Sequence, residues 1–455
     1  QHNMQAANAN RMLGITSGAQ SKSTEKLSSG YKINRAADDA AGLTISEKMR
    51  KQIRGLDKAS SNAQDGVSSV QTAEGALTEV HSMLQRMNEL AVQSANGTNS
   101  SDDRQAIQDE VDQLTTEIDR VAETTKFNEI YLLKGDNSNT KNVYMKGHDA
   151  GLKGSLTDGA KSATFTMDAL KTGDKVTIAG KEYSIGSTVA DAKKTYAAAA
   201  DGEKVTIDGT EYTVVGATGT EDAGANKLKV ASLDAKVKDG STVSYKTTTV
   251  KAMTDADNNS IDDDDSSIIS KDVAESKIKA ELLTANNIGT VNQAATVEDA
   301  NTANGKTSYT IHKGYATVAD TLSFNLHVGA DADMTNKITV DIDTMNSANL
   351  GIKGINVKDA SGTEATYAID AIADAVAKVS SQRSALGAVQ NRLEHTIDNL
   401  DNISENTSSA ESRIRDTDMA KEMVNYSKNN ILAQAGQSML AQANQSNQGV
   451  LSLLQ

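Results

Sequence analysis

The sequence predicts a multidomain α+β protein. We expect both ends of the chain to form a long α-helical coiled-coil stalk, with a β-rich outer domain inserted between them. Apolar and small residues recur every three or four positions over residues 38–95, and again from about residue 366. Over residues 128–365 an alternation with a period of two replaces that spacing. A period near 3.5 is typical of coiled-coil helices, and a period of two is typical of strands.

The composition argues against one large globule. The 455 residues include no Cys, Pro or Trp, and the net charge is −15. Leu, Ile, Val and Phe together make up less than a fifth of the chain. A chain this poor in large apolar residues is close to the limit at which burial no longer offsets the entropy of ordering. From the length we expect about three domains.

Several function classes are excluded or disfavoured. Without Cys there are no disulfides, thiolate zinc sites, iron–sulfur clusters or Cys nucleophiles. The acidic balance argues against nucleic-acid binding. No stretch approaches 18 consecutive apolar residues, so we expect no membrane insertion. Residues 1–14 carry no apolar run typical of a signal peptide, so a cleaved signal is not expected.

The first long helix has the strongest periodic signal. Asp38 and Asp39 are expected to cap its start, and Gly97 to mark its end. Three internal glycines weaken such a helix by about 1 kcal/mol each, so it needs partners. The stripe of apolar and small residues consists of Ile45, Met49, Ile53, Leu56, Ala59, Ala63, Val67, Val70, Ala73, Leu77, Val80, Leu84, Met87 and Ala91.

A second helix is predicted to start near Ser101 and Asp102. The turn at 96–99 that precedes it is short, so the two helices should pack antiparallel. Acidic residues crowd its N-terminal half, where the helix dipole favours them. Its stripe is Ile107, Val111, Leu114, Ile118 and Val121.

The middle of the chain contains an internal repeat. Residues 175–183, Lys-Val-Thr-Ile-Ala-Gly-Lys-Glu-Tyr, recur 29 positions later at 204–212 as Lys-Val-Thr-Ile-Asp-Gly-Thr-Glu-Tyr. Each copy is predicted to be a hairpin, since Asp-Gly is a strong two-residue turn signal. Two copies are too few for a solenoid, so we interpret them as hairpins of one β-rich domain. A short helix is expected around 273–283 and a strand at 323–328.

A long helix is predicted again after residue 366. Its stripe is Ile369, Ile372, Val376, Val379, Leu386, Val389, Leu393, Ile397, Leu400 and Ile403. Residues 416–455 and 1–35 are amphipathic, and by themselves they bury little. Because helices that need partners will find each other, the two ends of the chain should meet, which leaves the middle as an insertion.

No constellation of residues indicates catalysis. The six His include no pair at i, i+4, and no Gly-rich phosphate loop occurs. Asp255–Asp265 resembles a calcium loop at its first three ligand positions, but Ser260 and Ser266 stand where Gly and Glu are needed. We interpret it as a solvated acidic loop, with a weak cation site as the alternative. We therefore predict no enzyme and no catalytic, cofactor-binding or metal residues.

Both ends of the chain resemble bacterial flagellins. Residues 26–42, Lys-Leu-Ser-Ser-Gly-Tyr-Lys-Ile-Asn-Arg-Ala-Ala-Asp-Asp-Ala-Ala-Gly, are similar to the N-terminal signature of that family. The stretches 62–66, 71–77, 84–93 and 127–128 follow in the family's order, and 384–393, 409–416 and 440–454 resemble its C-terminal end. The resemblance covers about 1–140 and 366–455.

The resemblance implies a structural subunit that polymerises into the flagellar filament for swimming motility. Residues 1–35 and 416–455 would form the inner filament core, 36–140 and 366–415 a helical stalk, and 141–365 a variable surface-exposed insert. The implied partners are other copies of the chain and the flagellar export chaperone, cap and hook-junction proteins. Flagellar type III export would deliver the chain to the extracellular flagellum, and no cofactor is implied.

The resemblance also implies recognition by host receptors. The residues that match a Toll-like receptor 5 site are Arg86, Glu89, Leu90, Gln93 and Glu110. Leu451, Leu453 and Leu454 match the polymerisation end that cytosolic inflammasome receptors sense. Two alternatives remain: a hook–filament junction protein, and an adhesin activity in the central insert. The absence of Cys and Pro also fits a chain that travels unfolded and then refolds quickly.

Overall fold

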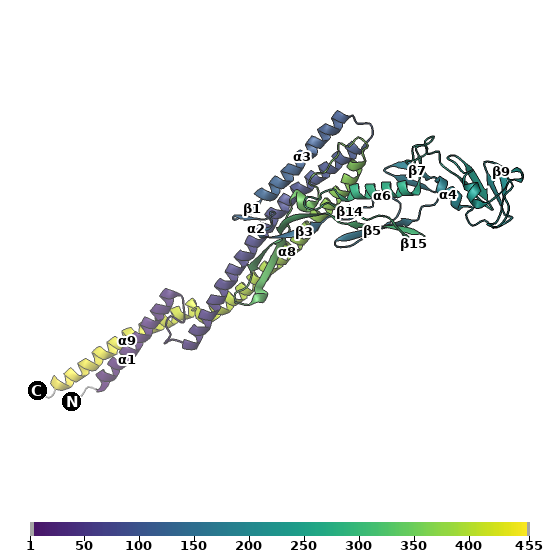
Figure 1. The fold of residues 1–455 in the computed structure, drawn as a ribbon. Helices are drawn as coiled ribbons and strands as arrows, with labels where there is room; N and C mark the ends of the chain where they lie inside the picture. Colours follow the sequence, from purple (N-terminus) through teal and green to yellow (C-terminus); the bar gives the residue numbers. More distant parts are fainter. Residues whose placement is uncertain (1–3, 453–455) are drawn as a thin grey trace. The chain divides into compact units, whose positions relative to one another are not determined.

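The computed structural model describes residues 4–452, and it describes side chains over residues 4–445. The chain divides into two compact units. The first contains the residues up to Val70, Phe324–Val340 and those from Gly387 onward, and the second contains Gln71–Ser323 and Asp341–Leu386. The long helices come from the two ends of the chain and the strands from its middle, which confirms the predicted α+β class (Figure 1).

In the first unit the two ends of the chain meet, as predicted. Helices α1 (Met4–Ser29) and α9 (Met419–Ser452) lie side by side (Figure 1). Where the two helices approach the rest of the unit, the Lys32 amide donates to the Arg415 carbonyl at 2.6 Å. The Thr417 amide donates to the Gly30 carbonyl at 2.9 Å. Two backbone hydrogen bonds therefore tie the end of α1 to the start of α9.

Helix α2 (Ala40–Ala95) confirms the predicted stripe over most of its length. From Leu56 to Ala91 every stripe residue except the partly buried Val67 is buried, whereas Ile45 is 47% exposed. The Asp39 carboxylate accepts the backbone N–H of Gly42 at 2.9 Å and so caps the helix as expected.

Asp38 has a different role beside the same helix start. Its carboxylate accepts the backbone N–H groups of Arg35 and Asn34, at 3.0 and 3.2 Å. These two bonds, followed by the neighbouring Lys22, lower the pKa of Asp38. Asp39 alone therefore caps α2 as predicted, whereas Asp38 closes the turn that precedes the helix.

The other predicted helices are also present. Helix α3 (Ser101–Thr124) starts at a capping box, in which the side chains of Ser100 and Asp103 bond each other's backbone N–H. Helix α8 (Thr363–Arg415) begins three residues before the predicted start and continues past Ile403. In it Leu386, Leu393 and Leu400 are buried and Ile403 is exposed. The predicted short helix at 273–283 is α6 (Lys271–Asn286).

The strands form six small sheets in the described chain, and two of them include a parallel pair, β10 with β9 and β13 with β7. In the three larger sheets the strand orders are β10-β9-β8-β11-β12, β14-β16-β5-β4 and β13-β7-β6. The remaining pairs are β1-β2, β17-β3 and β18-β19, and β18 is the predicted strand near 323–328. The strands are β1 (Lys126–Phe127), β2 (Ile130–Tyr131), β3 (Asp136–Tyr144), β4 (Ser155–Asp158), β5 (Ser162–Asp168), β6 (Lys175–Ile178), β7 (Lys181–Ile185), β8 (Lys204–Ile207), β9 (Thr210–Val214), β10 (Lys227–Leu228), β11 (Thr242–Tyr245), β12 (Thr248–Lys251), β13 (Ile268–Ile269), β14 (Thr296–Val297), β15 (Asn301–Ala303), β16 (Lys306–His312), β17 (Tyr315–Asp320), β18 (Leu322–His327) and β19 (Lys337–Ile342).

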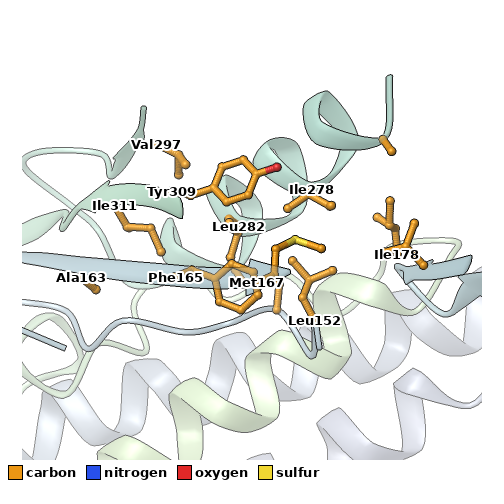
Figure 2. Packing of buried hydrophobic residues seen from close by; sticks show 14 of the residues in the cluster. Leu152, Ala163, Phe165, Met167, Ile178, Ile278, Leu282, Val297, Tyr309 and Ile311 are labelled. Carbon is orange, nitrogen blue, oxygen red and sulfur yellow. The ribbon is translucent and has the colours of Figure 1, made fainter. Parts of the chain in front are cut away.

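The larger core of the second unit lies between α6 and the sheet that contains β5 and β16. Phe165 and Tyr309 face each other across these two strands with ring centroids 6.4 Å apart (Figure 2). Ile278 and Leu282 of α6 pack against the same cluster (Figure 2). All four side chains are fully buried, so this layer has a complete core within the chain.

A second core lies within residues 189–252. The sheet that contains β8, β9 and β11 packs with the short helices α4 (Val189–Lys194) and α5 (Val230–Asp234). Tyr196, Leu233 and Val243 are fully buried in it. The two repeated hairpins are thus confirmed, but they lie in different sheets and contribute to separate cores. This arrangement differs from the single β-rich domain expected from the sequence, because β8 and β9 are flanked by β11 and β10, whereas β7 pairs with β13.

We predict that Leu282→Ala destabilises the second unit by about 2–5 kcal/mol, because it leaves a cavity in a fully packed core. Leu432→Ala is the matched control, since Leu432 is 50% exposed. Chemical denaturation followed by circular dichroism measures both free energies of unfolding. Equal effects of the two substitutions would contradict the assigned core.

We also predict a pH dependence in the second core. Glu203 accepts hydrogen bonds from the Tyr245 hydroxyl and the Ala200 amide and pairs with Lys246, which together lower its pKa from 4.5 to about 2. Because the folded pKa lies below the ordinary value, the stabilisation is present above pH 4.5 and is lost as pH falls toward 2. Thermal melts over this range should show a larger loss for the native chain than for Glu203→Gln.

Candidate functional site

Helices α1 and α9 carry a large set of exposed apolar side chains. Isolated exposed apolar residues are common on proteins, but a set concentrated on one helix pair marks an interaction surface. The set, which we call the terminal apolar surface, consists of Met4, Met12, Ile15, Met419, Met423, Val424, Ile431, Leu432 and Met439. Val424 and Ile431 are the most exposed of its α9 members, at 68% and 67%.

The same helix pair has almost no core of its own. Ser23 is the one buried residue of α1, and none of the α9 side chains over residues 419–445 is buried. Most helical stability in proteins comes from packing of the apolar face, and this pair does not bury that face within the described chain. The terminal apolar surface is therefore incomplete without further partners.

Part of this surface is hollowed into a groove on α9. The groove has a volume of about 510 Å³, and its lining is mostly apolar. The residues that line it are Met423, Val424, Ser427, Lys428, Ile431 and Leu432. Methionine and aliphatic side chains at spacings of three and four can accept a facing helix, so the groove suits helix–helix contact.

Arg415 holds the helix pair at its base. Its guanidinium carbon lies 4.9 Å from the centroid of the Tyr31 ring, and its Nη1 donates to Glu47 Oε1 at 2.7 Å. The side chain is only 14% exposed. No sequence spacing indicated this contact, because Glu47 and Arg415 are 368 residues apart and meet only in the folded chain.

The residues matched to a receptor site converge on one face of α2 and α3. Arg86 Nε donates to Glu110 Oε1 at 2.8 Å, and Nη1 donates to Glu89 Oε2 at 3.2 Å. Both hydrogen bonds raise the pKa of Arg86, and the one to Glu110 has the larger effect. Gln93 is exposed one turn farther along, whereas Leu90 is buried. The charged members thus form an exposed network, which we call the Arg86 patch, and Leu90 is not part of its exposed surface.

The comparisons with known proteins point to one family. The model for the bacterial flagellin N-terminal helical region matches residues 1–138, and that for the C-terminal helical region matches residues 369–454. A flagellin from Clostridium tyrobutyricum is 41% identical over 98% of this chain and 99% of its own length. The chain belongs to the bacterial flagellin family.

Other relatives carry the same description. Flagellin from Bacillus subtilis (strain 168) is 34% identical and covers the whole of this chain and 98% of its own length. Among solved structures, the flagellar junction protein FlgL from Legionella pneumophila is 14% identical, covers 82% of this chain and 99% of its own, and has a TM-score of 0.32. A TM-score below 0.5 supports no conclusion about the shape or function of this chain.

Membership of the flagellin family settles the general role of the chain. Flagellins are structural proteins, and they polymerise into the extracellular filament of the bacterial flagellum. This chain is therefore a filament subunit whose partners include other copies of itself. Within residues 4–452, none of the helices is both long and apolar enough to cross a membrane.

The acidic loop and the C-terminal leucines are the remaining sequence predictions. In the acidic loop, Asp255 accepts the backbone N–H groups of Asn259 and Ser260 at 2.9 and 3.0 Å. Over residues 4–452 no group of three or more His, Asp or Glu side chains is arranged to hold a metal ion. Leu451 lies near the end of α9, and Leu453 and Leu454 lie outside the described residues.

We predict that Arg415→Ala loosens the terminal helices, because it removes both the Tyr31 and the Glu47 contact. Hydrogen exchange of the monomeric chain should become several-fold faster within α1 and α9. Arg413→Ala is the control, since Arg413 is exposed and donates only to Ser409 on its own helix. An unchanged exchange rate in Arg415→Ala would show that these two contacts, which we call the Arg415 clamp, do not stabilise the terminal helices.

Proposed function

We propose that the terminal apolar surface is the contact through which subunits polymerise, and that residues 1–35 and 416–455 form the inner core of the filament. The observation that carries this proposal is the lack of buried apolar side chains between α1 and α9 over the described side chains. Burying apolar area contributes about 25 cal/mol per Å², so covering this surface with neighbouring subunits stabilises both helices. The free chain lacks that contribution.

The contact must be heterologous to build a filament. A surface that pairs with itself closes into a dimer, whereas unlike faces that meet repeatedly generate an open helical polymer. The groove on α9 and the apolar residues of α1 are unlike surfaces of the same chain. A subunit can therefore present one to the neighbour on one side and the other to the next.

The remaining segments extend the same proposal outward. Residues 36–140 and 366–415 would form the helical shell around the inner core, and residues 141–365 the exposed insert. The insert contributes most of two cores that close within the chain, and Tyr367 of α8 completes the first, so these cores require no neighbouring subunit. A self-sufficient domain suits the outside of a filament, where neighbours are fewest.

Delivery to the filament forms a further part of the proposal. The chain would leave through flagellar type III export, with an export chaperone before export and the hook-junction and cap proteins at the filament. The absence of Cys and Pro supports passage in an unfolded state. Without them, no disulfide crosslinks the chain and no slow prolyl isomerisation delays refolding.

The Arg86 patch is proposed as a recognition site for Toll-like receptor 5. Exposed Arg and Glu side chains that already hold each other in place lose little freedom when they bind, and Arg is common among binding hot spots. Leu90 would act indirectly, because its side chain is buried. By family resemblance we also propose Leu451, Leu453 and Leu454 as the end sensed by inflammasome receptors.

The alternatives make different predictions. A hook–filament junction protein would not elongate into long filaments, and the relatives named flagellin favour the filament subunit. An adhesin activity would reside in the insert, so removing residues 141–365 would abolish attachment to a host surface while filaments persist. Unchanged attachment of the deletion variant would eliminate the adhesin hypothesis.

For polymerisation we predict that Leu432→Glu prevents or strongly slows seeded filament growth, since it places a charge in the α9 groove. Val291→Glu is the matched control, because Val291 is 46% exposed, close to the 50% of Leu432, but lies in the insert. Electron microscopy and light scattering after seeding measure the outcome. Normal growth of Leu432→Glu filaments would overturn the assignment.

For the receptor we predict that Arg86→Ala lowers signalling potency at least about tenfold, the effect of losing about 1.4 kcal/mol of binding. Arg120→Ala is the control. Like Arg86, Arg120 is exposed and pairs with a Glu three residues away on its own helix, here Glu117 of α3. Dose–response curves with monomeric protein and a receptor reporter cell line give both potencies. Equal potency of the two variants would exclude the Arg86 patch as the contact.

A further inference from the structure

The insert contains a duplication in which one copy is nested inside the other. The Gly173 amide donates to the Ile185 carbonyl at 2.8 Å, and 29 residues later the Gly202 amide donates to the Val214 carbonyl at 2.9 Å. The strand registers of the two hairpins also agree residue for residue at this spacing. Lys175–Glu182 and Lys204–Glu211 form equivalent salt bridges, both at 2.7 Å.

The third strand of each copy shows the nesting. β13 pairs in parallel with β7 through Ile268 and Ser184, and β10 pairs in parallel with β9 through Lys227 and Thr213. Ser184 and Thr213 are equivalent positions of the repeat, so β13 and β10 are equivalent strands. β13, however, follows the whole second copy in the chain. The second copy therefore occupies the connection between β7 and β13.

The two copies differ at one edge. In the second copy β8 is covered by β11, with Thr206 opposite Ser244. In the first copy β6 is the edge of its sheet, and no other described strand pairs with its outer side. Thr177, the equivalent of Thr206, is exposed, whereas Thr206 is half-buried. The first copy thus lacks a partner that its duplicate possesses.

The backbone of Thr177 is free to accept that partner. The two-residue turn at Ala179–Gly180, with φ values of 50° and 76°, makes Ile178 and Lys181 a hydrogen-bonded pair. Since such pairs alternate along an antiparallel ladder, the N–H and C=O of Thr177 point away from β7. An unpaired edge of this kind is a template for strand addition.

Within the described chain, the carboxylate of Asp174, beside this strand edge, lacks the basic partner that its equivalent in the second copy has. In the second copy Glu203 accepts the Ala200 amide at 2.8 Å, binds the Tyr245 hydroxyl and pairs with Lys246 Nζ at 3.0 Å. Its equivalent Asp174 accepts the Lys171 amide at 2.8 Å in the same way. Over residues 4–452, however, Asp174 has no salt-bridge partner. A carboxylate therefore stands where an added strand would place a basic side chain.

A groove follows β6 beside this carboxylate. Its volume is about 610 Å³. Met167, Leu170 and Val176 supply apolar lining, while Asp174, Lys175 and Thr177 supply polar groups. Apolar side chains under an open strand edge are the arrangement that peptide-binding sheets use for affinity and specificity.

We propose that β6 is a docking edge for an extended segment of a different polypeptide. The segment adds as an antiparallel strand beside Thr177, and it carries hydroxyl and β-branched residues followed by a tyrosine and a basic residue that reach Asp174. This chemistry is that of residues 242–246, which recognise the equivalent strand in the second copy. This edge belongs to the insert and shares no residue with the terminal apolar surface or the Arg86 patch.

The test uses the full chain and a fluorescent peptide with the sequence of residues 241–247. We expect saturable binding by fluorescence anisotropy at peptide concentrations up to about 1 mM, which corresponds to about −4 kcal/mol. Thr177→Pro removes the outward N–H at an edge position where proline is tolerated, and should weaken binding at least about tenfold. Thr177→Val keeps the N–H and should bind like the native chain. Asp174→Asn should weaken binding and reduce its salt dependence.

Circular dichroism and thermal melts establish that the variants remain folded. Absence of saturable binding to the native chain would overturn the proposal, as would equal binding by Thr177→Pro and Thr177→Val. Sedimentation of the chain without peptide adds one further outcome. Self-association that Thr177→Pro abolishes, with no peptide binding, would identify a second copy as the occupant and refute the proposed partner.

Discussion

The structure of this flagellin depends on one constraint: over the side chains that the structure describes, the terminal helices bury no apolar residue within their own chain. Two backbone hydrogen bonds and the Arg415 contacts hold α1 and α9 together at their base. Beyond that base, no described apolar side chain of either helix is buried, and most of the large ones are exposed. In the proposed assembly, burial against neighbouring subunits would supply the free energy that an isolated helix pair lacks.

The insert differs from the terminal helices because it contains buried apolar cores. It has two closed cores, the first centred on Phe165 and Tyr309 and the second on Tyr196 and Leu233. Each core can form without a neighbouring subunit. One chain thus contains a part with buried cores and a terminal helix pair that buries no apolar side chain over the described residues. The low content of large apolar residues reflects both parts, since the terminal helices need little internal core and the insert divides its core into two small ones.

Most of the fold was predictable from the sequence, because the relevant patterns are local. A period of 3.5 identified α2 and α8, and the repeated Lys-Val-Thr-Ile segments identified both hairpins. The Arg86 patch was found only through resemblance to a family, since its residues look like ordinary solvated positions on a helix. The Arg415 clamp was missed because it joins positions far apart in the sequence. The division of the hairpins between two sheets was missed because it depends on which distant strands pair with each hairpin.

By itself, then, the sequence determined the helices, the hairpins, the family and the need of the terminal segments for partners. Each of these follows from residue types at fixed local spacings. Only the tertiary structure decided that Leu90 is buried while Arg86, Glu89 and Glu110 form a network. It alone decided that β8 is covered and β6 is open, although both strands have the sequence Lys-Val-Thr-Ile. Strand neighbours and buried faces are set by contacts between distant segments, and identical local sequences carry no information about those contacts.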